Sequence, residues 1–291
     1  MQIRKTAPEQ LSEVASFVSR LQTDNTHHIC YFGTETSLIE QYLEEQFEPA
    51  WHQCFLLAYE KSKLIGLLGV EYDTTLGRAW LHGPMVDHKD WQAIADKLLE
   101  TAQQQIIPPE VTDLELAGDI ANTNLRTLAK RKSFTTGGPS YSLRFERKKL
   151  AKLPVIKATP LIPQYYEAFE LLHDKLFPGT YYSGRQLIER LDDQKTAFIA
   201  AAHGVLQGYI YAQIDIGSNE GYIDFLGVEN FARRRGIGTK LIIAAVRWLF
   251  SFEDVNEVSL TVNEQDKGAI ELYTRVGFDL TRTLQGYRKK S

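Results

Sequence analysis

The chain has 291 residues, of which 43% are hydrophobic and 24% charged, and its formal net charge is −4. This composition predicts a globular protein of one or two domains and excludes a disordered or fibrous chain. The net negative charge disfavours a dedicated nucleic-acid binder, because such proteins usually carry a basic excess over a whole face.

The cysteines and the first residues narrow the cellular setting. Cys30 and Cys54 are the only cysteines, so the sequence has neither a disulfide framework nor the ligand spacing of a metal site. Residues 1–8 lack the apolar stretch of a secretory signal, and no window has the length and apolarity of a membrane span. We expect a cytoplasmic protein without a metal, and with neither nucleic acid nor a membrane as a partner.

Strand-like and helix-like patterns alternate along the chain, which predicts an α/β (α+β) fold, and their order occurs twice. Each half contains a strand, a tight turn, a returning strand with a glycine (Gly66 or Gly208), and a further apolar strand that leads into a helix. The equivalent segments are residues 54–60, 64–71 and 80–86 in the first half and residues 197–202, 205–212 and 222–228 in the second. This internal repeat predicts two structurally related domains.

The boundary between the domains is placed in residues 146–154, where a basic run precedes Pro154 and the hydrophobic period is lost. A charged edge strand is the alternative interpretation of this run. We expect one domain over residues 1–147 and a second over residues 154–291.

A glycine-containing turn in the second half predicts an anion site. The run Arg233-Arg-Arg-Gly-Ile-Gly238 follows the strand 222–228 and opens the helical run 239–250. Gly236 and Gly238 let the backbone approach a phosphate closely, the helix start presents free N–H groups, and the arginines add charged donors. The spacing is neither that of a Walker loop nor that of a dinucleotide-binding fingerprint. A plain turn with a solvated arginine face is the alternative interpretation.

A second pattern follows downstream. Residues 257–262 alternate as a strand, Asp266 stands at the expected N-cap of a helix over 267–276, and Gly277 ends this helix. Tyr273 lies on the helix.

Together, the patterns Arg233-x-x-Gly236-x-Gly238 and Asp266-x-x-Ala269-Ile-Glu-Leu-Tyr273-x-x-x-Gly277-Phe278 resemble the GNAT superfamily of N-acetyltransferases. The resemblance covers residues 154–291 and, through the internal repeat, extends loosely over residues 1–145. It implies a tandem protein of two GNAT-like domains, each with a mixed, mostly antiparallel sheet flanked by helices. It also implies that the strands 222–228 and 257–262 splay apart and admit the acetyl-pantetheine arm of acetyl-CoA.

The resemblance also implies contacts to acetyl-CoA. Main-chain groups of Leu226, Gly227 and Val228 are expected to pair with the pantetheine. The turn and the helix start are expected to hold the diphosphate, through Arg233, Arg234, Arg235, Gly236, Ile237, Gly238 and Thr239. Asp266 stands where the family usually has an asparagine, so the amide donor of that contact is lost, and Asn263 lies nearby at a different spacing.

The implied reaction is the transfer of an acetyl group from acetyl-CoA to a primary amine of a small molecule or peptide by direct attack. Tyr273 matches the position of the family's acid for the departing thiolate, and a packed core tyrosine is the alternative interpretation. A main-chain N–H near Val228 would polarise the thioester carbonyl.

The candidate base is Asp224, whose strand parity places it on the same face as Tyr222 and Val228; Glu220 and Glu229 are competitors. His173 is expected to be a packed histidine, and the pair His27–His28 has no metal-binding partner set. Residues around Tyr181–Tyr182 and 189–193 are candidates for a cationic acceptor pocket, or for plain surface.

The first half lacks these chemical features, since Trp91, Ile94, Asp96 and Ala129 stand at the corresponding positions. We hypothesise a degenerate domain that binds CoA poorly or not at all, packs against the active domain and walls part of the acceptor cleft. A non-catalytic acetyl-CoA sensor or interaction module is the alternative function for the whole chain.

Overall fold

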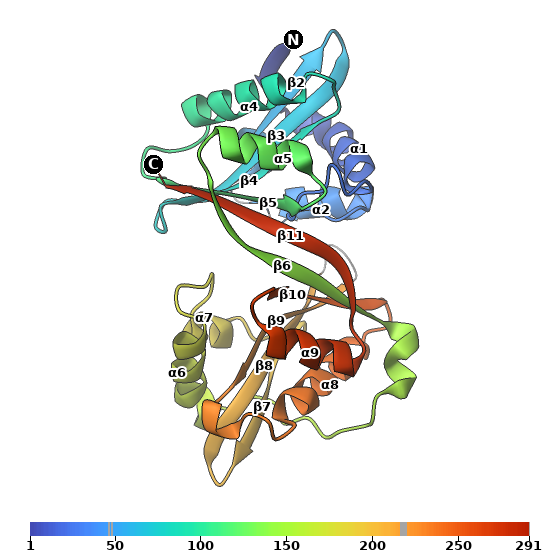
Figure 1. Ribbon diagram of the computed structural model, residues 1–291, viewed down its shortest axis with the longest axis vertical. Coiled ribbons are helices and arrows are strands. Elements are labelled where there is room, and N and C mark those ends of the chain that lie inside the picture. The colour runs from blue at the N-terminus through green and yellow to red at the C-terminus, as the bar shows by residue number, and fades with distance from the viewer. Residues whose placement is uncertain (46, 48, 216–219, 291) are drawn as a thin grey trace. The chain divides into compact units, whose positions relative to one another are not determined.

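The computed structural model describes residues 1–45, 47, 49–215 and 220–290 (Figure 1). The chain divides into two compact units. Unit 1 consists of Met1–Ser140 and Arg282–Ser291, and unit 2 of Tyr141–Thr281. Among the described residues, no helix combines the length and the apolar composition that crossing a membrane requires.

Unit 1 alternates strands and helices. In chain order its elements are β1 (Gln2–Lys5), η1 (Pro8–Gln10), α1 (Leu11–Gln22), α2 (Thr36–Glu45), α3 (Trp51–Cys54), β2 (Phe55–Glu60), β3 (Lys63–Asp73), β4 (Arg78–Val86), α4 (Trp91–Gln105), β5 (Asp113–Asp119), α5 (Thr123–Arg131) and the first part of β6 (Thr135–Glu146). The strand order is β1-β2-β3-β4-β5-β11-β6, where β11 (Asp279–Lys290) enters unit 1 from Arg282 onward. Strands β4 and β5 are parallel, and β5 and β11 are antiparallel.

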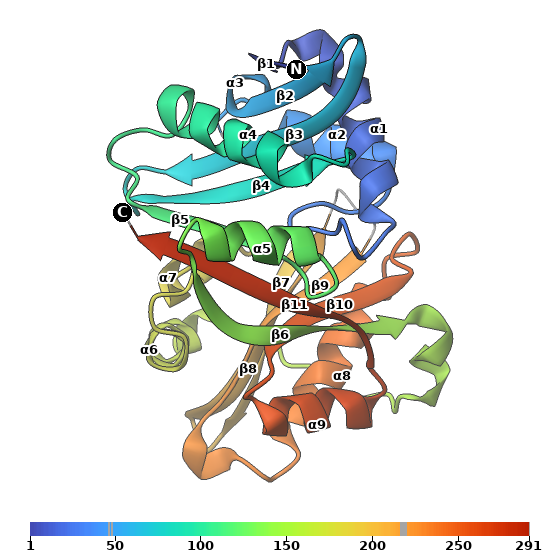
Figure 2. The same cartoon turned by 45° about the horizontal axis from the view of Figure 1, so that its top comes forward.

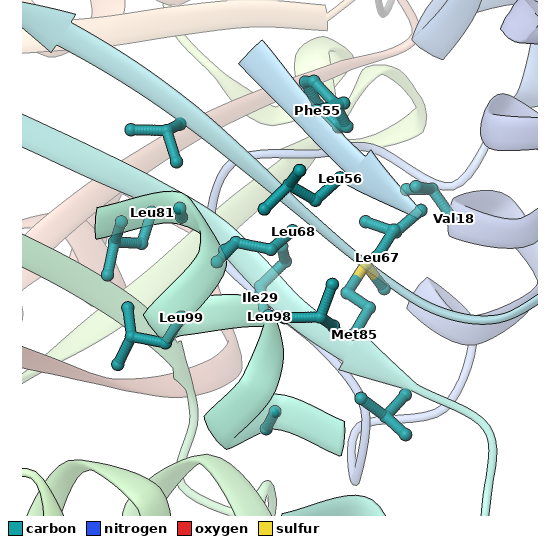
Figure 3. Close-up of a cluster of buried hydrophobic side chains, with 14 of the residues drawn as sticks. Val18, Ile29, Phe55, Leu56, Leu67, Leu68, Leu81, Met85, Leu98 and Leu99 are labelled. Carbon is teal, nitrogen blue, oxygen red and sulfur yellow. The ribbon is translucent and has the colours of Figure 1, made fainter. Parts of the chain in front are cut away.

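The core of unit 1 lies on both faces of this sheet, because successive side chains of a strand point to opposite faces. Leu56 and Leu68 are directly opposite on β2 and β3 and lie toward Leu98 of α4, whereas Leu67 lies toward Val18 of α1 (Figure 3). All five side chains are buried. The alternation in sequence therefore becomes a sheet covered by helices on two sides.

Unit 2 repeats the same alternation. After the last part of β6 its elements are η2 (Arg147–Lys152), η3 (Pro163–Tyr165), α6 (Tyr166–Leu176), α7 (Gly184–Glu189), β7 (Lys195–Ala202), β8 (Val205–Asp215), β9 (Glu220–Val228), η4 (Asn230–Ala232), α8 (Ile237–Leu249), β10 (Glu257–Asn263), α9 (Lys267–Val276) and the start of β11. Its strands follow the order β6-β10-β9-β8-β7, with β9 and β10 parallel. One apolar cluster packs α8 and α9 on one face, and another packs α6 and α7 on the other (Figure 2).

The two units share a register as well as an order of elements. In unit 1, β2 and β3 have a bulge where the pair Ala58–Gly66 is followed by Tyr59–Leu64. In unit 2, β7 and β8 have the same bulge, where Ala200–Gly208 is followed by Ala201–Leu206. The internal repeat predicted from the sequence is therefore present in the structure.

The division between the units differs from the expected linker over residues 146–154, which lies inside unit 2. The guanidinium of Arg147 donates hydrogen bonds to the carbonyl oxygens of Phe250 (2.9 Å) and Val255 (2.8 Å), which lie at and just beyond the C-terminal end of α8. A cation at this position is favourable, because it satisfies free carbonyl groups and complements the helix dipole. The division falls instead at Ser140–Tyr141, within β6.

The last strand is anchored in unit 1 by an ion pair. The Nε of Arg288 on β11 lies 2.7 and 2.8 Å from the carboxylate oxygens of Asp113 on β5, and Tyr287 beside it is buried. The hydrogen bonds from Arg288 hold the pKa of Asp113 below its usual range. The stabilisation from this carboxylate is therefore present at neutral pH and is lost as the pH falls through its depressed pKa.

We expect Asp113→Asn to reduce the free energy of unfolding by about 1–3 kcal/mol at pH 7, as for a hydrogen bond to a charged group. The difference from wild type should shrink at pH 3, because Asp113 of the unfolded chain is then largely protonated and the native ion pair contributes less to the free energy of unfolding. Urea denaturation at both pH values measures it, with exposed Glu110→Gln as the control. A deficit that is the same at both pH values would contradict the assignment.

Candidate active site

The turn between β9 and α8 has the geometry of an anion site. Arg234 and Gly236 adopt left-handed backbone conformations, with φ of 63° and 77°. Gly236 is the N-cap of α8, and among the residues that the structure describes no side chain caps this helix. The N–H groups of Ile237, Gly238 and Thr239 therefore have no side-chain acceptor at a helix start where the dipole favours negative charge.

Gly238 fixes the distance between α8 and α9. A Cβ atom at this position would lie 2.8 Å from Cδ2 of Leu272, which is on α9 beside Tyr273. The missing side chain thus lets the helix with Tyr273 approach the turn closely. Of the three arginines, Arg233 donates from Nε to the carbonyl of Val228 (3.1 Å), and all three side chains are exposed.

Strands β9 and β10 diverge next to this turn. They pair in register only from Glu220–Glu257 to Tyr222–Ser259, although β9 continues to Val228 and β10 to Asn263. Leu226, Gly227 and Val228 lie in the divergent part of β9, and their registered partners are on β8. The structure therefore contains the splay that the resemblance implied, with the three expected pantetheine-binding residues along it.

The hydroxyl of Tyr222 lies at the point of divergence and donates to Oγ1 of Thr261 on β10 (3.1 Å). In the sequence, Tyr222 served only to define strand parity, because no local pattern marks it. Its position at the last registered pair of β9 and β10 is a feature of the tertiary structure. Thr261 is exposed on β10, so this pair of hydroxyls lies at the inner end of the splay.

Asp224 is the extra residue of a β-bulge on β9. On β8, Tyr211 pairs with Phe225 and Ala212 with Ile223, which leaves Asp224 without an opposite residue. Its Oδ1 accepts hydrogen bonds from the hydroxyl of Tyr181 (2.9 Å) and from Nε2 of Gln213 (3.3 Å).

The bulge overturns one step of the sequence argument. Beyond Asp224 the parity of β9 changes, so that Phe225 packs with the α6–α7 cluster while Val228 packs against the α8–α9 cluster. Asp224 contacts Tyr181, whose ring lies 5.2 Å from that of Phe225, and it therefore faces the α6–α7 side. The prediction that Asp224 and Val228 share a face is wrong, because a bulge inserts one residue into the period-2 pattern.

Tyr273 is buried on α9, 7% exposed, with its ring 5.8 Å from that of Phe278. Burial raises the pKa of its phenol well above the usual value, and Tyr222 and Asp266 raise it further. The group is therefore protonated at physiological pH. Asp266 occupies the N-cap of α9, but its side chain makes no capping hydrogen bond.

The competing base Glu229 forms an ion pair with Lys175 on α6, with Nζ 2.9 Å from Oε2. Of the predicted acceptor residues, Tyr182 has the guanidinium of Arg190 over its ring at 4.3 Å, and Tyr181 is half exposed. Tyr181 and Tyr182 thus form an aromatic wall beside Asp224.

His173 has structural partners for both of its ring nitrogens. His173 is buried on α6; its Nδ1 lies 2.6 Å from the hydroxyl of Tyr209, and its Nε2 lies 2.9 Å from the carbonyl oxygen of Tyr182. Burial lowers the pKa of His173 and lowers that of His28 to about 4, so both are neutral at physiological pH. The expectation that His173 is packed is confirmed.

In unit 1 the corresponding strands also diverge, but a segment of the chain fills the space. Strands β4 and β5 pair only from Arg78–Asp113 to Trp80–Glu115. Further along β5, the N–H of Cys30 donates to the carbonyl of Ala117 (3.0 Å), and the N–H of Asp119 donates to the carbonyl of His28 (3.3 Å). Residues 28–30 occupy the edge that faces β4, because β11 pairs with the other edge of β5.

Two further features hold this segment in place. The buried carboxamide of Gln22 donates to the carbonyl of Ile29 (2.9 Å) and accepts from its N–H (2.8 Å). A Cβ atom at Gly118 would lie 2.7 Å from the carbonyl oxygen of His28, so only glycine permits this close approach.

The residues of unit 1 that replace the anion site have structural roles. Trp91 and Ile94 are buried in the core, as is Ala129. Asp96 forms ion pairs with Arg131 and with Lys132 (3.1 Å). Trp91, Ile94 and Asp96 all lie within α4, whereas Arg233 and Gly236 precede α8, so the alignment by sequence offset does not match the two helix starts.

Comparisons with known proteins agree with this geometry. Residues 162–278 match the acetyltransferase (GNAT) family. A segment of 111 residues is 32% identical to an N-alpha-acetyltransferase of Sulfurisphaera tokodaii, and the match covers 34% of this chain and 66% of that protein. This chain therefore spans just under two thirds of that relative.

Two solved structures resemble the whole chain. A GCN5-related N-acetyltransferase from Sphaerobacter thermophilus has a TM-score of 0.77 at 16% identity, over 99% of this chain and 95% of that chain. A tandem GNAT protein from the clavulanic acid biosynthesis pathway has a TM-score of 0.69 at 12% identity, over 99% and 98%. At these identities the likeness shows the fold alone, and it confirms the predicted fold with a mixed sheet and flanking helices.

A pair of carboxyl groups lies at the paired end of β9 and β10, before the two strands diverge. Glu220 and Glu257 are opposite in register, the hydroxyl of Ser259 donates to Oε2 of Glu220 (3.2 Å), and Arg144 lies 2.9 Å from Glu257. Burial raises the pKa of Glu220, and the neighbouring Glu257 raises it further. The native state therefore binds this proton more tightly than the unfolded chain does, and the resulting stabilisation is lost as the pH rises through the raised pKa.

We expect Glu220→Gln to be more stable, relative to wild type, at pH 9 than at pH 5, because the amide cannot ionise. Midpoints of urea denaturation at the two pH values measure this difference. Glu271→Gln, on the exposed surface of α9, is the matched control and should shift equally at both. If Glu220→Gln behaves like the control, the carboxyl is not shifted as described.

Proposed function

Since residues 162–278 match the acetyltransferase (GNAT) family, we propose that this chain is an acetyl-CoA-dependent N-acetyltransferase whose catalytic unit is unit 2. The divergence of β9 and β10 carries the proposal. One end of this splay adjoins the uncapped start of α8, and the other adjoins Tyr222 and Tyr273. A ligand with a diphosphate and an extended amide-containing arm matches both features.

The chemical groups that unit 2 offers at this site fit those of acetyl-CoA. The diphosphate would be held by N–H groups from Arg234 to Thr239, with Arg233 and Arg235 adding charge. The amide groups of the pantetheine arm would pair with the main chain of Leu226 to Val228, in place of a neighbouring strand. Asp266 makes no capping hydrogen bond within its own helix, but it offers a carboxylate where the family pattern has an amide donor, so its contact to acetyl-CoA is the weakest of the set.

In the proposed reaction, a neutral amine attacks the thioester carbonyl, a new C–N bond forms, the C–S bond breaks, and the thiolate leaves with the electron pair. An N–H near Val228 would hold the carbonyl oxygen as its charge develops. Tyr273 would donate to the thiolate, and its raised pKa keeps it protonated for that role. Its donation should therefore persist at alkaline pH.

Asp224 is proposed as the base. It would take a proton from the ammonium group of the acceptor, directly or through water, and so produce the neutral amine that attacks. Its position on a bulge brings the carboxylate out of the regular strand, and Tyr181 and Gln213 orient it. Glu229 is engaged by Lys175, which makes it the weaker competitor.

The acceptor is proposed to be a primary amine of a small molecule or peptide. The relative from Sulfurisphaera tokodaii is called an N-alpha-acetyltransferase, so peptides with a free α-amine belong in the first assays. The aromatic wall of Tyr181 and Tyr182 beside the Asp224 carboxylate suits an ammonium group, through charge and cation–π attraction.

Unit 1, which contains most of the degenerate domain proposed over residues 1–147, is proposed to bind no acetyl-CoA. Residues 28–30 occupy the edge of β5 that a pantetheine arm would need, and the corresponding helix α4 begins with the buried side chain of Trp91. The catalytic domain over residues 154–291 then acts alone, and one chain carries one active site. A non-catalytic acetyl-CoA sensor remains the second candidate function, and turnover distinguishes the two.

We expect Tyr273→Phe to lower kcat by about 10²–10³, as for the loss of a positioned proton donor, while the Kd for acetyl-CoA stays within about threefold. Release of free thiol from acetyl-CoA, with a panel of amines and peptides, measures kcat. Tyr166→Phe, on α6 and outside the proposed site, is the matched control. Acetyl-CoA binding without turnover by the wild type across the panel would favour the sensor.

We expect the wild type to bind one acetyl-CoA per chain, and Gly236→Glu to bind none. The glutamate would place a negative charge at the diphosphate site, and its left-handed conformation at φ 77° costs about 1–2 kcal/mol. Equilibrium dialysis gives the stoichiometry, and the thermal transition shows whether the variant is folded. A folded variant that keeps one site would place acetyl-CoA in unit 1.

A further inference from the structure

A cavity of about 360 Å³ lies in unit 2 between the segment 156–159, β7 and α8 (Figure 1 shows the elements). Ligand sites in proteins begin at about 300 Å³, so this space suits a small molecule. Its walls are about as polar as they are apolar, and they combine one face of α8 with the edge strand. The apolar side chains of the lining on these elements include Ile156, Ala158, Phe198, Ile237, Leu241 and Ala244.

The cavity is separate from the proposed acetyl-CoA site. Its lining contains no residue of β9, β10 or α9 among those the structure describes, whereas the splay is formed by those elements. The segment 156–159 closes it from outside. This segment is held against β7 by hydrogen bonds from the N–H of Ile199 to the carbonyl of Thr159 (2.8 Å) and from the N–H of Leu161 to that of Ala197 (2.8 Å).

The polar residues of the cavity give it a positive rim. Lys157 and Lys240 line it with Gln207 and Thr159, and no aspartate or glutamate is part of the described lining. Neither ammonium group forms an ion pair with a residue that the structure describes. Two cations at the edge of a partly apolar space favour an anion with an apolar body, whose charge stays at the rim while its chain is buried.

The cavity and the turn share a residue. Ile237 begins α8, so its main-chain N–H belongs to the uncapped helix start while its side chain lines the cavity. Lys240 follows in the first turn of the same helix. A ligand that fixes Ile237 also fixes the start of α8, and binding at one of two such linked sites changes the affinity at the other.

We propose that this cavity is a second ligand site, which binds a small carboxylate with a short apolar chain and is coupled to acetyl-CoA binding through the first turn of α8. The binding itself does not depend on the proposed enzymatic function. Octanoate serves as the probe, and 1-octanol, which has the same chain without the charge, serves as its neutral counterpart.

The first experiment is calorimetric titration of the full chain with octanoate in the absence of acetyl-CoA. We expect saturable binding of one octanoate per chain, and at least about tenfold weaker binding of 1-octanol, as for the loss of a charge-assisted contact. Lys157→Gln should weaken octanoate about tenfold, and Ala158→Phe, which fills the cavity from the outer segment, should abolish its binding. Lys267→Gln, an exposed lysine at the start of α9, should change nothing.

Binding that is absent, or that Lys157→Gln and Ala158→Phe both leave unchanged, would overturn the site. Should Ala158→Phe fail to fold, Lys157→Gln alone decides. The second experiment measures the Kd of acetyl-CoA with and without saturating octanoate, where we expect a change of at least about threefold, matched by the same factor in the reverse titration. Octanoate binding without this change would overturn the coupling, and octanoate binding without any acetyl-CoA binding would refute the proposed function but not the cavity site.

Discussion

The site depends on a rule of backbone chemistry: parallel strands that diverge leave N–H and C=O groups that some other partner must satisfy. In unit 2, β9 and β10 diverge after Tyr222 and Ser259. In unit 1, β4 and β5 diverge after Trp80 and Glu115, and the main chain of residues 28–30 takes up the edge of β5. One fold thus meets the same requirement twice, with its own chain in unit 1 and, we propose, with a cosubstrate in unit 2.

The two glycines of the turn serve this arrangement for different reasons. Gly236 adopts φ 77°, which other residues reach only at a cost, and a Cβ there would meet open space. Gly238 has no such conformation, but a Cβ there would collide with Leu272 of α9. The first glycine therefore shapes the anion site, and the second sets how closely the helix with Tyr273 can pack. Because both belong to one short segment, the proposed diphosphate site and the packing of the helix with Tyr273 depend on the same turn.

Much of the fold was predictable from the sequence, because the repeat appears in the local pattern of apolar residues and glycines. The hairpin with Gly66 recurs around Gly208, and both form with the same bulge. The bulge at Asp224 was not predictable, since the alternation of β9 in sequence and in exposure continues unbroken while the register against β8 shifts by one. The role of residues 28–30 was equally hidden, because a polar stretch after α1 carries no local sign that it pairs with β5. Local pattern determines which elements form, whereas register shifts and segment pairing depend on tertiary contacts.

Strand β11 begins in unit 2 and ends in unit 1, so it links the folding of unit 1 to the proposed chemistry of unit 2. Tyr287 is buried in the core of unit 1, and Arg288 pairs with Asp113 there, so the sheet of unit 1 needs the last residues of the chain. The same strand begins at Asp279, directly after Gly277 and Phe278, which end the helix that carries Tyr273. Unit 1, which we propose to bind no acetyl-CoA, therefore still has a structural use, because it holds the strand that follows the proposed catalytic helix.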